Sequence, residues 1–189
     1  MKFILSCFLI AFMQNAIASE VTPKKNSRTG MLSWHAEEPE ISLELIQLLP
    51  DYVKAVFSSR GLPKELINTL QDYCVFGTII KNKSTDTVSY QITDWRYITA
   101  DGKEHKIKTK SAWAKQWADM NIPFRWLLLP EKQEFNVGDW SQGFTTIKLA
   151  PATLFSLRYS WSHQGKTKQR TLNNLSCAPA TMAIPTSNN

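Results

Sequence analysis

The chain has 189 residues and a formal net charge of +6, with 43% hydrophobic and 20% charged residues. After the first 18 residues, no stretch approaches the about 20 apolar residues that a membrane-spanning helix needs. We therefore expect a soluble mature chain of ordinary one-domain size. The basic bias is modest and gives no reason to expect a nucleic-acid partner.

The N-terminus has the pattern of a secretory signal peptide over residues 1–18. A positive start precedes a short apolar run, and Ala16 and Ala18 supply small residues at positions −3 and −1 of the cleavage site. The mature chain would begin at Ser19 and be periplasmic or secreted. One alternative is a buried first element of a cytosolic domain. Another is a lipid anchor at Cys7, which has no apolar segment ahead of it and is discounted.

Two cysteines remain in the mature chain, Cys74 and Cys177. An even number of cysteines in an oxidising compartment favours a disulfide. This bridge would close a loop of about 100 residues, for which chain entropy gives at most about 4–5 kcal/mol of stabilisation. The alternatives are two buried thiols or an intermolecular bridge.

Before residue 73 the sequence predicts a lead-in and two short helices. Residues 19–40 are polar, without a sustained period, and are expected to be flexible. Asp51 is the expected cap of a first helix that ends at Gly61, and Pro63 occupies the first turn of a second. Apolar residues recur at helical spacing in both: Val53, Val56 and Phe57, then Leu66, Ile67 and Leu70.

From Tyr73 the period changes to two, which indicates strands. Asp101-Gly102 is a hairpin signal, and Ser111 is the expected cap of one inserted helix that carries Trp113, Trp117 and Met120. The expected strands cover residues 74–80, 88–98, 104–109, 124–129, 144–149, 154–162 and 167–172.

These elements predict a single mainly β domain over residues 41–177, followed by a loose tail over residues 178–189. The expected architecture is an antiparallel immunoglobulin-like sandwich or a partly open barrel, with a helical N-terminal segment and one inserted helix. The bridge would join the first strand of this domain to the end of the last.

The segment 75–103 resembles the opening of small bacterial extracytoplasmic immunoglobulin-like modules. Gly77, Asn82 and Ser84 mark a strand and turn, and the strand that follows ends in Asp101-Gly102. The resemblance covers about 30 residues and implies a β-sandwich that mediates assembly or adhesion, mostly without catalysis. It transfers no functional residue to this chain.

The sequence offers few groups for catalysis or for a cofactor. The three histidines lie far apart, and neither a metal motif nor a nucleophile elbow is present. Paired carboxylates could hydrolyse a glycoside, and Asp94 stands out because it lies mid-strand, although it could simply face solvent or pair with Arg96. The available carboxylates are Asp94, Asp101, Glu104, Glu131, Glu134 and Asp139.

Two patterns suggest binding instead. Of the seven tryptophans, Trp34 and Trp140 are the better candidates for an exposed, glycan-binding surface, whereas Trp113, Trp117 and Trp161 are expected in the core. Basic side chains also alternate along two predicted strands. They could form one cationic surface for an anionic polymer, phospholipid head groups or an acidic partner, or merely protect strand edges. The two basic trios are Lys106, Lys108 and Lys110, and Lys166, Lys168 and Arg170.

The sequence therefore favours a non-catalytic exported protein that binds or helps assemble another component of the cell envelope, without a cofactor. A glycan-binding module that uses exposed tryptophan is the alternative, and an envelope hydrolase comes third.

Overall fold

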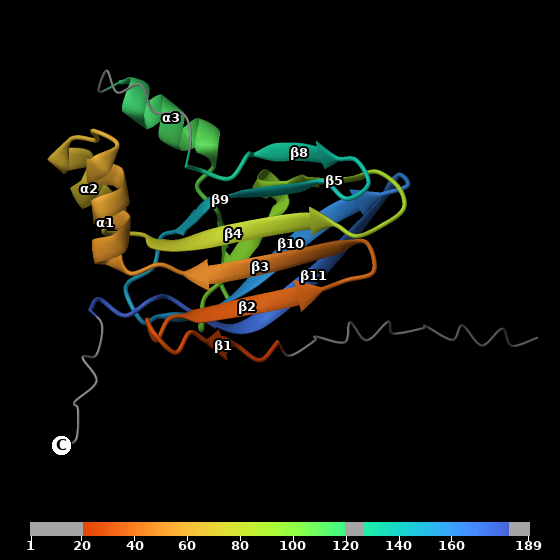
Figure 1. The fold of residues 1–189 in the computed structure, drawn as a ribbon, viewed down its shortest axis with the longest axis horizontal. Coiled ribbons are helices and arrows are strands. Elements are labelled where there is room, and N and C mark those ends of the chain that lie inside the picture. The colour runs from red at the N-terminus through yellow and green to blue at the C-terminus, as the bar shows by residue number, and fades with distance from the viewer. Residues whose placement is uncertain (1–20, 120–126, 182–189) are drawn as a thin grey trace, which may run out of the picture.

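Two antiparallel β-sheets packed face to face, as in a β-sandwich, form the body of the protein (Figure 1). The structure is a computed structural model that describes residues 21–119 and 127–181. The first sheet has the order β1 (Lys24–Lys25), β2 (Leu32–Glu37), β3 (Ile41–Gln47), β4 (Cys74–Asn82) and β9 (Trp140–Ile147). The second contains β5 (Val88–Gln91), β6 (Arg96–Ile98), β7 (Glu104–Lys106), β8 (Lys132–Phe135), β10 (Leu154–His163) and β11 (Lys166–Ser176).

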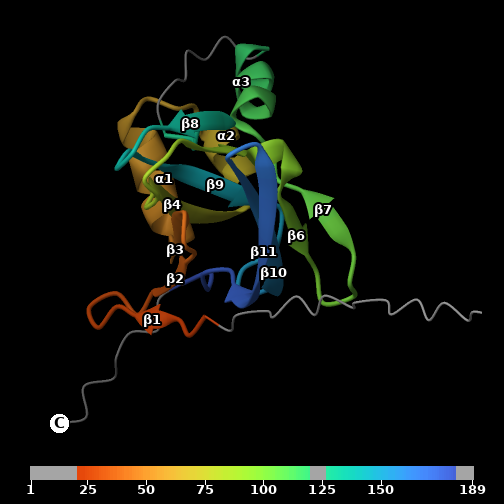
Figure 2. The ribbon, with the colours of Figure 1, turned by 90° about the vertical axis from the view of Figure 1, so that its right-hand side faces the viewer.

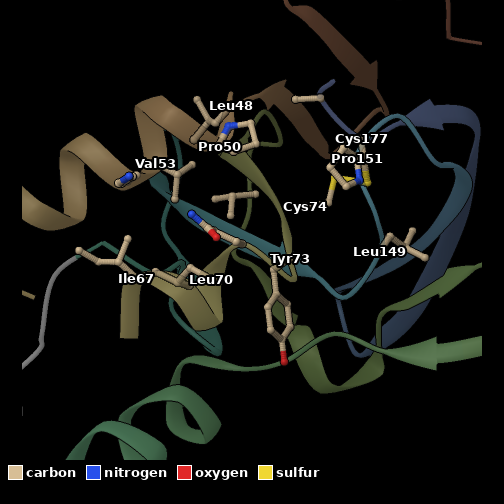
Figure 3. Close-up of a pocket in the computed structure, with 14 residues that line it drawn as sticks. Leu48, Pro50, Val53, Ile67, Leu70, Tyr73, Cys74, Leu149, Pro151 and Cys177 are labelled. Atoms are coloured by element: carbon tan, nitrogen blue, oxygen red, sulfur yellow. A yellow bond between two sulfur atoms is a disulfide. The ribbon is translucent and has the colours of Figure 1, made fainter. Parts of the chain in front are cut away.

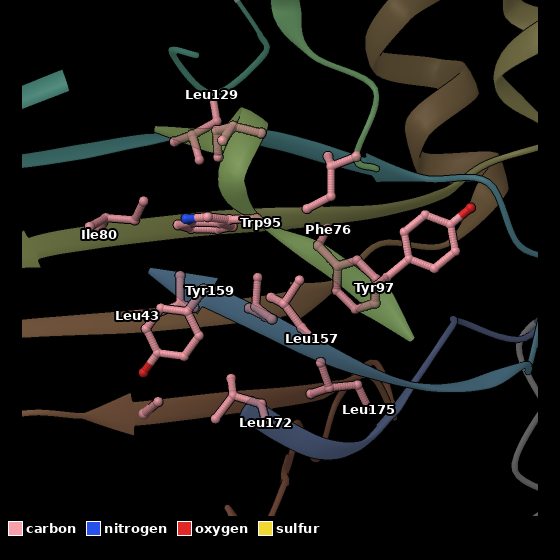
Figure 4. Packing of buried hydrophobic residues seen from close by; sticks show 14 of the residues in the cluster. Leu43, Phe76, Ile80, Trp95, Tyr97, Leu129, Leu157, Tyr159, Leu172 and Leu175 are labelled. Carbon is pink, nitrogen blue, oxygen red and sulfur yellow. The ribbon is translucent and has the colours of Figure 1, made fainter. Parts of the chain in front are cut away.

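The main core lies between the two sheets (Figure 4). Strand β10 alternates as its sequence predicts, and every second side chain from Phe155 to Trp161 is buried. Phe155 meets Phe76 of β4 edge-on, with ring centroids 5.7 Å apart. Burying aromatic side chains of this size contributes the largest share of core packing. The mainly β fold class is thus confirmed.

Three helices form a second layer against the outer face of the first sheet: α1 (Pro50–Ser59), α2 (Lys64–Leu70) and α3 (Lys110–Ala118). Figure 2 shows α1 on the side of β3 and β4 that faces away from β10 and β11. Phe57, Trp113 and Trp117 are buried in this second core. The indole nitrogen of Trp113 donates to Thr146 Oγ1 of β9 at 2.8 Å, which ties α3 to the sheet.

The expected flexible lead-in is wrong for its second half, because residues 32–37 form β2 and Trp34 is completely buried. The next strand, β3, was not predicted either. Both strands alternate between buried and less buried positions, as a half-covered sheet requires. The charges of Glu37, Glu38 and Glu40 at the turn between them conceal this period.

The helix starts differ from the predicted ones. Leu49 precedes α1 without a side-chain cap, and Pro50 rather than Asp51 opens the helix. A proline fits this first position because its fixed φ suits a helix and its missing N–H would be unpaired there anyway. In α3 the cap is Thr109 rather than Ser111, and its hydroxyl accepts from the Ala112 N–H at 3.3 Å.

The long strand predicted over residues 88–98 is interrupted. A 3-10 turn, η1 (Ile92–Asp94), separates β5 from β6, so Asp94 does not lie mid-strand. The Arg96 guanidinium donates to the carbonyls of Thr93 and Trp95, at 2.7 Å each, instead of pairing with Asp94. Of the strand predicted over 124–129, residues 124–126 lie outside the described part, and Leu128 forms a single parallel bridge with Phe144.

The predicted disulfide between Cys74 and Cys177 is present and spans 103 residues of sequence. It links the start of β4, the fourth strand rather than the first, to the residue after β11. Apolar side chains, including Leu149 and Pro151, lie beside the disulfide (Figure 3). The cavity there measures only about 20 Å³, enough for about one water molecule. It is therefore a packing seam and not a ligand site.

The disulfide gives a first prediction. Replacing both Cys74 and Cys177 with alanine should lower the free energy of unfolding by about 2–5 kcal/mol, because the unfolded chain loses a constraint on a long loop. Urea unfolding of the oxidised protein and of the double variant measures the difference. Alkylation of either cysteine in the native oxidised protein, before reduction, would contradict the bridge.

Gly143 in β9 marks a close approach between two backbone segments. A Cβ atom at this position would lie 2.4 Å from the backbone nitrogen of Leu129 and 2.8 Å from the carbonyl carbon of Leu128. The backbone of these two residues packs directly against β9, where the Leu129 N–H donates to the Phe144 carbonyl at 3.0 Å, and only glycine leaves room for it.

We expect Gly143→Ala to destabilise the protein by about 3 kcal/mol, the upper end of overpacking penalties, because rigid backbone blocks the added methyl group. Gly77→Ala on the neighbouring strand is the matched control, since its new Cβ would meet Ile46 at an ordinary 3.7 Å. The control should be neutral or stabilising by up to about 1 kcal/mol. Chemical unfolding of both variants tests the pair, and equal stability of the two would contradict the close approach.

Candidate functional site

A large hollow lies on the outer face of the first sheet, beside the start of α1. It has a volume of about 550 Å³. Its floor includes Ile46 of β3, and the exposed ring of Tyr52 stands at its helical side. The remaining lining comes from the β1–β2 turn, β2, β3 and the residues before α1: Asn26, Thr29, Met31, Ser33, Glu44, Gln47, Leu48 and Leu49.

A second hollow of about 300 Å³ continues from the first across β4 and β9, and Ile46 lines both. Gly77 lies between Ile46 and Phe144 in the strand register, so no side chain rises from the floor there. Ile79 follows two residues along β4 on the same face. The other lining residues are Thr78, Leu127, Gln142 and Gly143.

We call the two hollows together the outer trough. It runs across the strands from β2 to β9, which is three interstrand spacings or about 14 Å. Glu44 is the one charged side chain among its described lining residues. The outer trough can therefore accept an elongated, mostly apolar group with room for one cation.

Sequence reasoning did not find the outer trough, although part of its signal was present. The alternation of Ile41, Leu43 and Leu45, all buried, places Glu44 and Ile46 together on the opposite face of β3. The contribution of Gly77 depends on strand register, which the sequence does not reveal.

The two tryptophans predicted to be exposed differ in outcome. The predicted exposure of Trp34 is wrong, since its side chain packs in the main core against Phe76. Trp140 is 57% exposed at the start of β9, three residues after Val137, which is 62% exposed. Among the described tryptophans no second ring is exposed beside Trp140, so they do not form a flat aromatic row. Trp126 lies outside the described residues. The buried tryptophans are Trp34, Trp95, Trp113, Trp117 and Trp161.

The first basic trio does not lie along one strand. Lys106 ends β7, whereas Lys110 begins α3. Between them the Lys108 ammonium lies over the Trp113 ring, 3.5 Å from its centroid, and donates to Gln116. Burial lowers the pKa of Lys108, and the nearby charge of Lys148 adds to this effect. Lys108 therefore helps to dock α3 rather than facing a ligand.

The second basic trio faces the core side of its sheet. Lys168 pairs in register with Trp161, and Arg170 with Tyr159, both of which are buried. Lys106, in contrast, pairs in register with Arg96, and Arg96 pairs with Arg158, which lies on the opposite face of the sheet. Because directly paired residues share a face, the two trios lie on opposite faces. The prediction that they form a single cationic surface is therefore wrong.

The cations of β11 pair instead with the turn between β2 and β3. Lys168 Nζ lies 2.5 Å from Glu40 Oε1, and Arg170 Nε lies 3.0 Å from Glu38 Oε1. The Trp161 indole also donates to Glu40, at 3.2 Å. Burial acts to raise the pKa of Glu40, but the hydrogen bonds from Lys168 and Trp161 and the nearby positive charges outweigh it. The pKa of Glu40 therefore lies below its usual value.

This pairing predicts a specific acid sensitivity. A carboxylate whose pKa is lower in the folded state adds stability above its unfolded pKa, here about 4.5, and that stability is lost as the pH falls through the folded value. Glu40→Gln should lower the stability at pH 7 by about 1–3 kcal/mol and flatten the decline below pH 4.5. Urea midpoints measured between pH 2 and 7 test this.

Glu37→Gln is the control for this prediction. Hydrogen bonds from Lys83 and His35 lower the pKa of Glu37 to about 2, but this carboxylate is exposed and solvent screens the interaction. If the two variants change the pH profile of stability equally, the contacts of Glu40 with Lys168 and Trp161 have no special role.

A smaller, polar hollow of about 200 Å³ lies on the outer face of the second sheet. It opens between β5 and β10, which pair only through Val88 and Ser89 before they diverge. Beyond this point the Ser160 carbonyl accepts from the Trp95 indole at 3.1 Å. Hydroxyl, amide and charged groups line the hollow: Ser89, Gln91, Asp94, Lys132, Ser160, Ser162 and Thr167.

Within residues 21–119 and 127–181, none of the helices is long and apolar enough to cross a membrane. In the same ranges His, Cys, Asp and Glu side chains do not gather in a group of three that could hold a metal ion.

Comparison with known proteins gives little. The chain matches neither a family model nor a curated protein. Among solved structures it is similar to a Bacillus subtilis subsp. subtilis strain 168 protein (ycdA) that is provisionally classed as a lipoprotein. The sequences are 10% identical and the TM-score is 0.43; the alignment covers 74% of this chain and 38% of that chain. The chain thus spans about two fifths of the length of that protein, and this level of similarity supports no statement about family or function.

Proposed function

We propose that the protein is exported and that its mature chain binds a partner polypeptide of the cell envelope through the outer trough. The observation that carries this proposal is the trough itself, with an apolar floor on a sheet face and the exposed ring of Tyr52 at its side. Apolar surface that a fold leaves open on one side marks an interaction site.

The shape of the outer trough favours a polypeptide over a compact small molecule. Its length of about 14 Å matches about four residues of extended chain at about 3.3 Å each. A segment lying across the strands would contact Ile46 and Ile79, and the missing side chain at Gly77 would let its backbone approach the sheet.

Export is supported by two features. The residues at the N-terminus have the pattern of a signal peptide, and Cys74 is joined to Cys177, as is common in oxidising compartments. An immunoglobulin-like kinship, expected from the residues around Gly77 and Asp101, stays a prediction and agrees with a binding role.

Glycan binding is a second candidate, supported by the polar hollow on the second sheet. The side chains of Asp94 and Gln91 and the serine hydroxyls in this hollow can hydrogen-bond to a sugar. The polar hollow, at about 200 Å³, is smaller than the outer trough. It does not use Trp140, which lies on the first sheet.

Site-specific photocrosslinking in the native envelope tests the proposal. A benzoylphenylalanine residue at position 79, in the outer trough, should crosslink a discrete polypeptide. The same label at position 169, on the exposed outer face of β11, should not. Gly77→Leu should abolish the crosslink at position 79, since its side chain fills the trough floor, while Gly77→Ala should weaken it less. Crosslinking that is equal at both positions, or that survives Gly77→Leu, would contradict the proposal, and glycan captured by a label at position 160 would favour the second candidate.

A further inference from the structure

Among the described residues, the ion pairs do not engage the one charged side chain of the outer trough, Glu44. Glu44 lies on β3 between two inward-facing, buried leucines, so its side chain is on the outer face with Ile46. It is half-buried, and its neighbour in register on β4 is Ile79. On β2 its neighbour in register is His35, so the carboxylate lies between an apolar and a polar side chain, with Ile46 two residues further along β3.

The described ion pairs leave this carboxylate out. They engage Glu37, Glu38, Glu40, Asp101 and Glu104, but not Glu44. The nearest candidate in register, His35 on β2, instead has its Nε2 atom 2.8 Å from Glu37. Lys83 also pairs with Glu37.

A ligand that covers the outer trough would remove water from the Glu44 carboxylate. Covering an unpaired charge with apolar groups is costly, and the cost falls only if the ligand supplies an opposite charge. The exposed Tyr52 ring, which lines the same hollow, is a surface on which a cation can also rest. Charge complementarity thus selects a cationic group for this point of the trough.

We propose that the partner segment is an extended stretch of polypeptide that places a lysine or arginine side chain against Glu44 and apolar side chains on both sides of it. One set of apolar side chains would cover Met31, Leu48 and Leu49, and the other would cover Gly77, Ile79 and Phe144. This inference rests on the proposed function and adds the chemistry of the partner to it.

Three synthetic peptides test the charge requirement: acetyl-Leu-Val-Lys-Val-Leu-amide and its versions with glutamine or glutamate in the centre. Binding to the mature protein is measured by calorimetry at physiological ionic strength. The lysine peptide should bind about tenfold more tightly than the glutamine peptide, and the glutamate peptide should bind more weakly still, because like charges oppose each other. Glu44→Gln should remove the preference, and Glu44→Lys should reverse it.

Glu134→Lys is the matched control because Glu134 is exposed on β8 of the second sheet and the charge change is the same. It should keep the preference for lysine. If Glu134→Lys reverses the preference as Glu44→Lys does, net charge explains the result and the inference is overturned.

The outcomes separate this inference from the proposed function. Equal binding of all three peptides, lost in Gly77→Leu but unchanged in both Glu44 variants, would overturn the inference and keep the trough as a peptide site. If none of the three peptides binds, both the inference and the proposed function are overturned. Two further results would also overturn the inference. If the protein self-associates and Gly77→Leu abolishes the self-association, a second copy fills the trough. If the protein is retained on phosphatidylethanolamine vesicles and Gly77→Leu abolishes the retention, a lipid fills it.

Discussion

The pairing of one charged turn with one strand joins the two sheets at one end of the sandwich. Strand β11 directs Lys168 and Arg170 toward the core side, where two cations without partners would be costly. The turn between β2 and β3 supplies Glu38 and Glu40 as their partners. A turn of the first sheet thereby neutralises a strand of the second, and these contacts join the two sheets beside the main apolar core.

The disulfide secures the opposite end of the sandwich. Glu40 lies next to Ile41, which pairs with the end of β4, whereas Cys74 begins that strand about 26 Å away. Helices α1 to α3 cover one end of the outer face of the first sheet, and the outer trough is the part of that face that they leave open.

Much of the fold could be predicted from local patterns, because the evidence for each element lies in neighbouring residues. The alternation from Phe155 to Trp161 and the Asp101-Gly102 turn are of this kind, and both were confirmed. Strand β2 was missed because Glu37 and its neighbours resemble a solvated loop. The β11 partners of Glu38 and Glu40, which are Arg170 and Lys168, lie more than 120 residues away in sequence, so the role of these two carboxylates depends on tertiary structure.

The candidate site could not be predicted from local sequence patterns either. Sequence reasoning assigned binding to rows of positive charge, since alternating lysines suggest an exposed face. The structure gives Lys168 and Arg170 carboxylate partners and packs Lys108 against an aromatic ring. A charge that already has a partner within the fold has little left to offer a ligand. Glu44 differs from these cations because the described ion pairs do not include it. The alternation of β3 places Glu44 on the outer face, but its position beside Ile79 depends on the register of β3 and β4, which the sequence does not reveal.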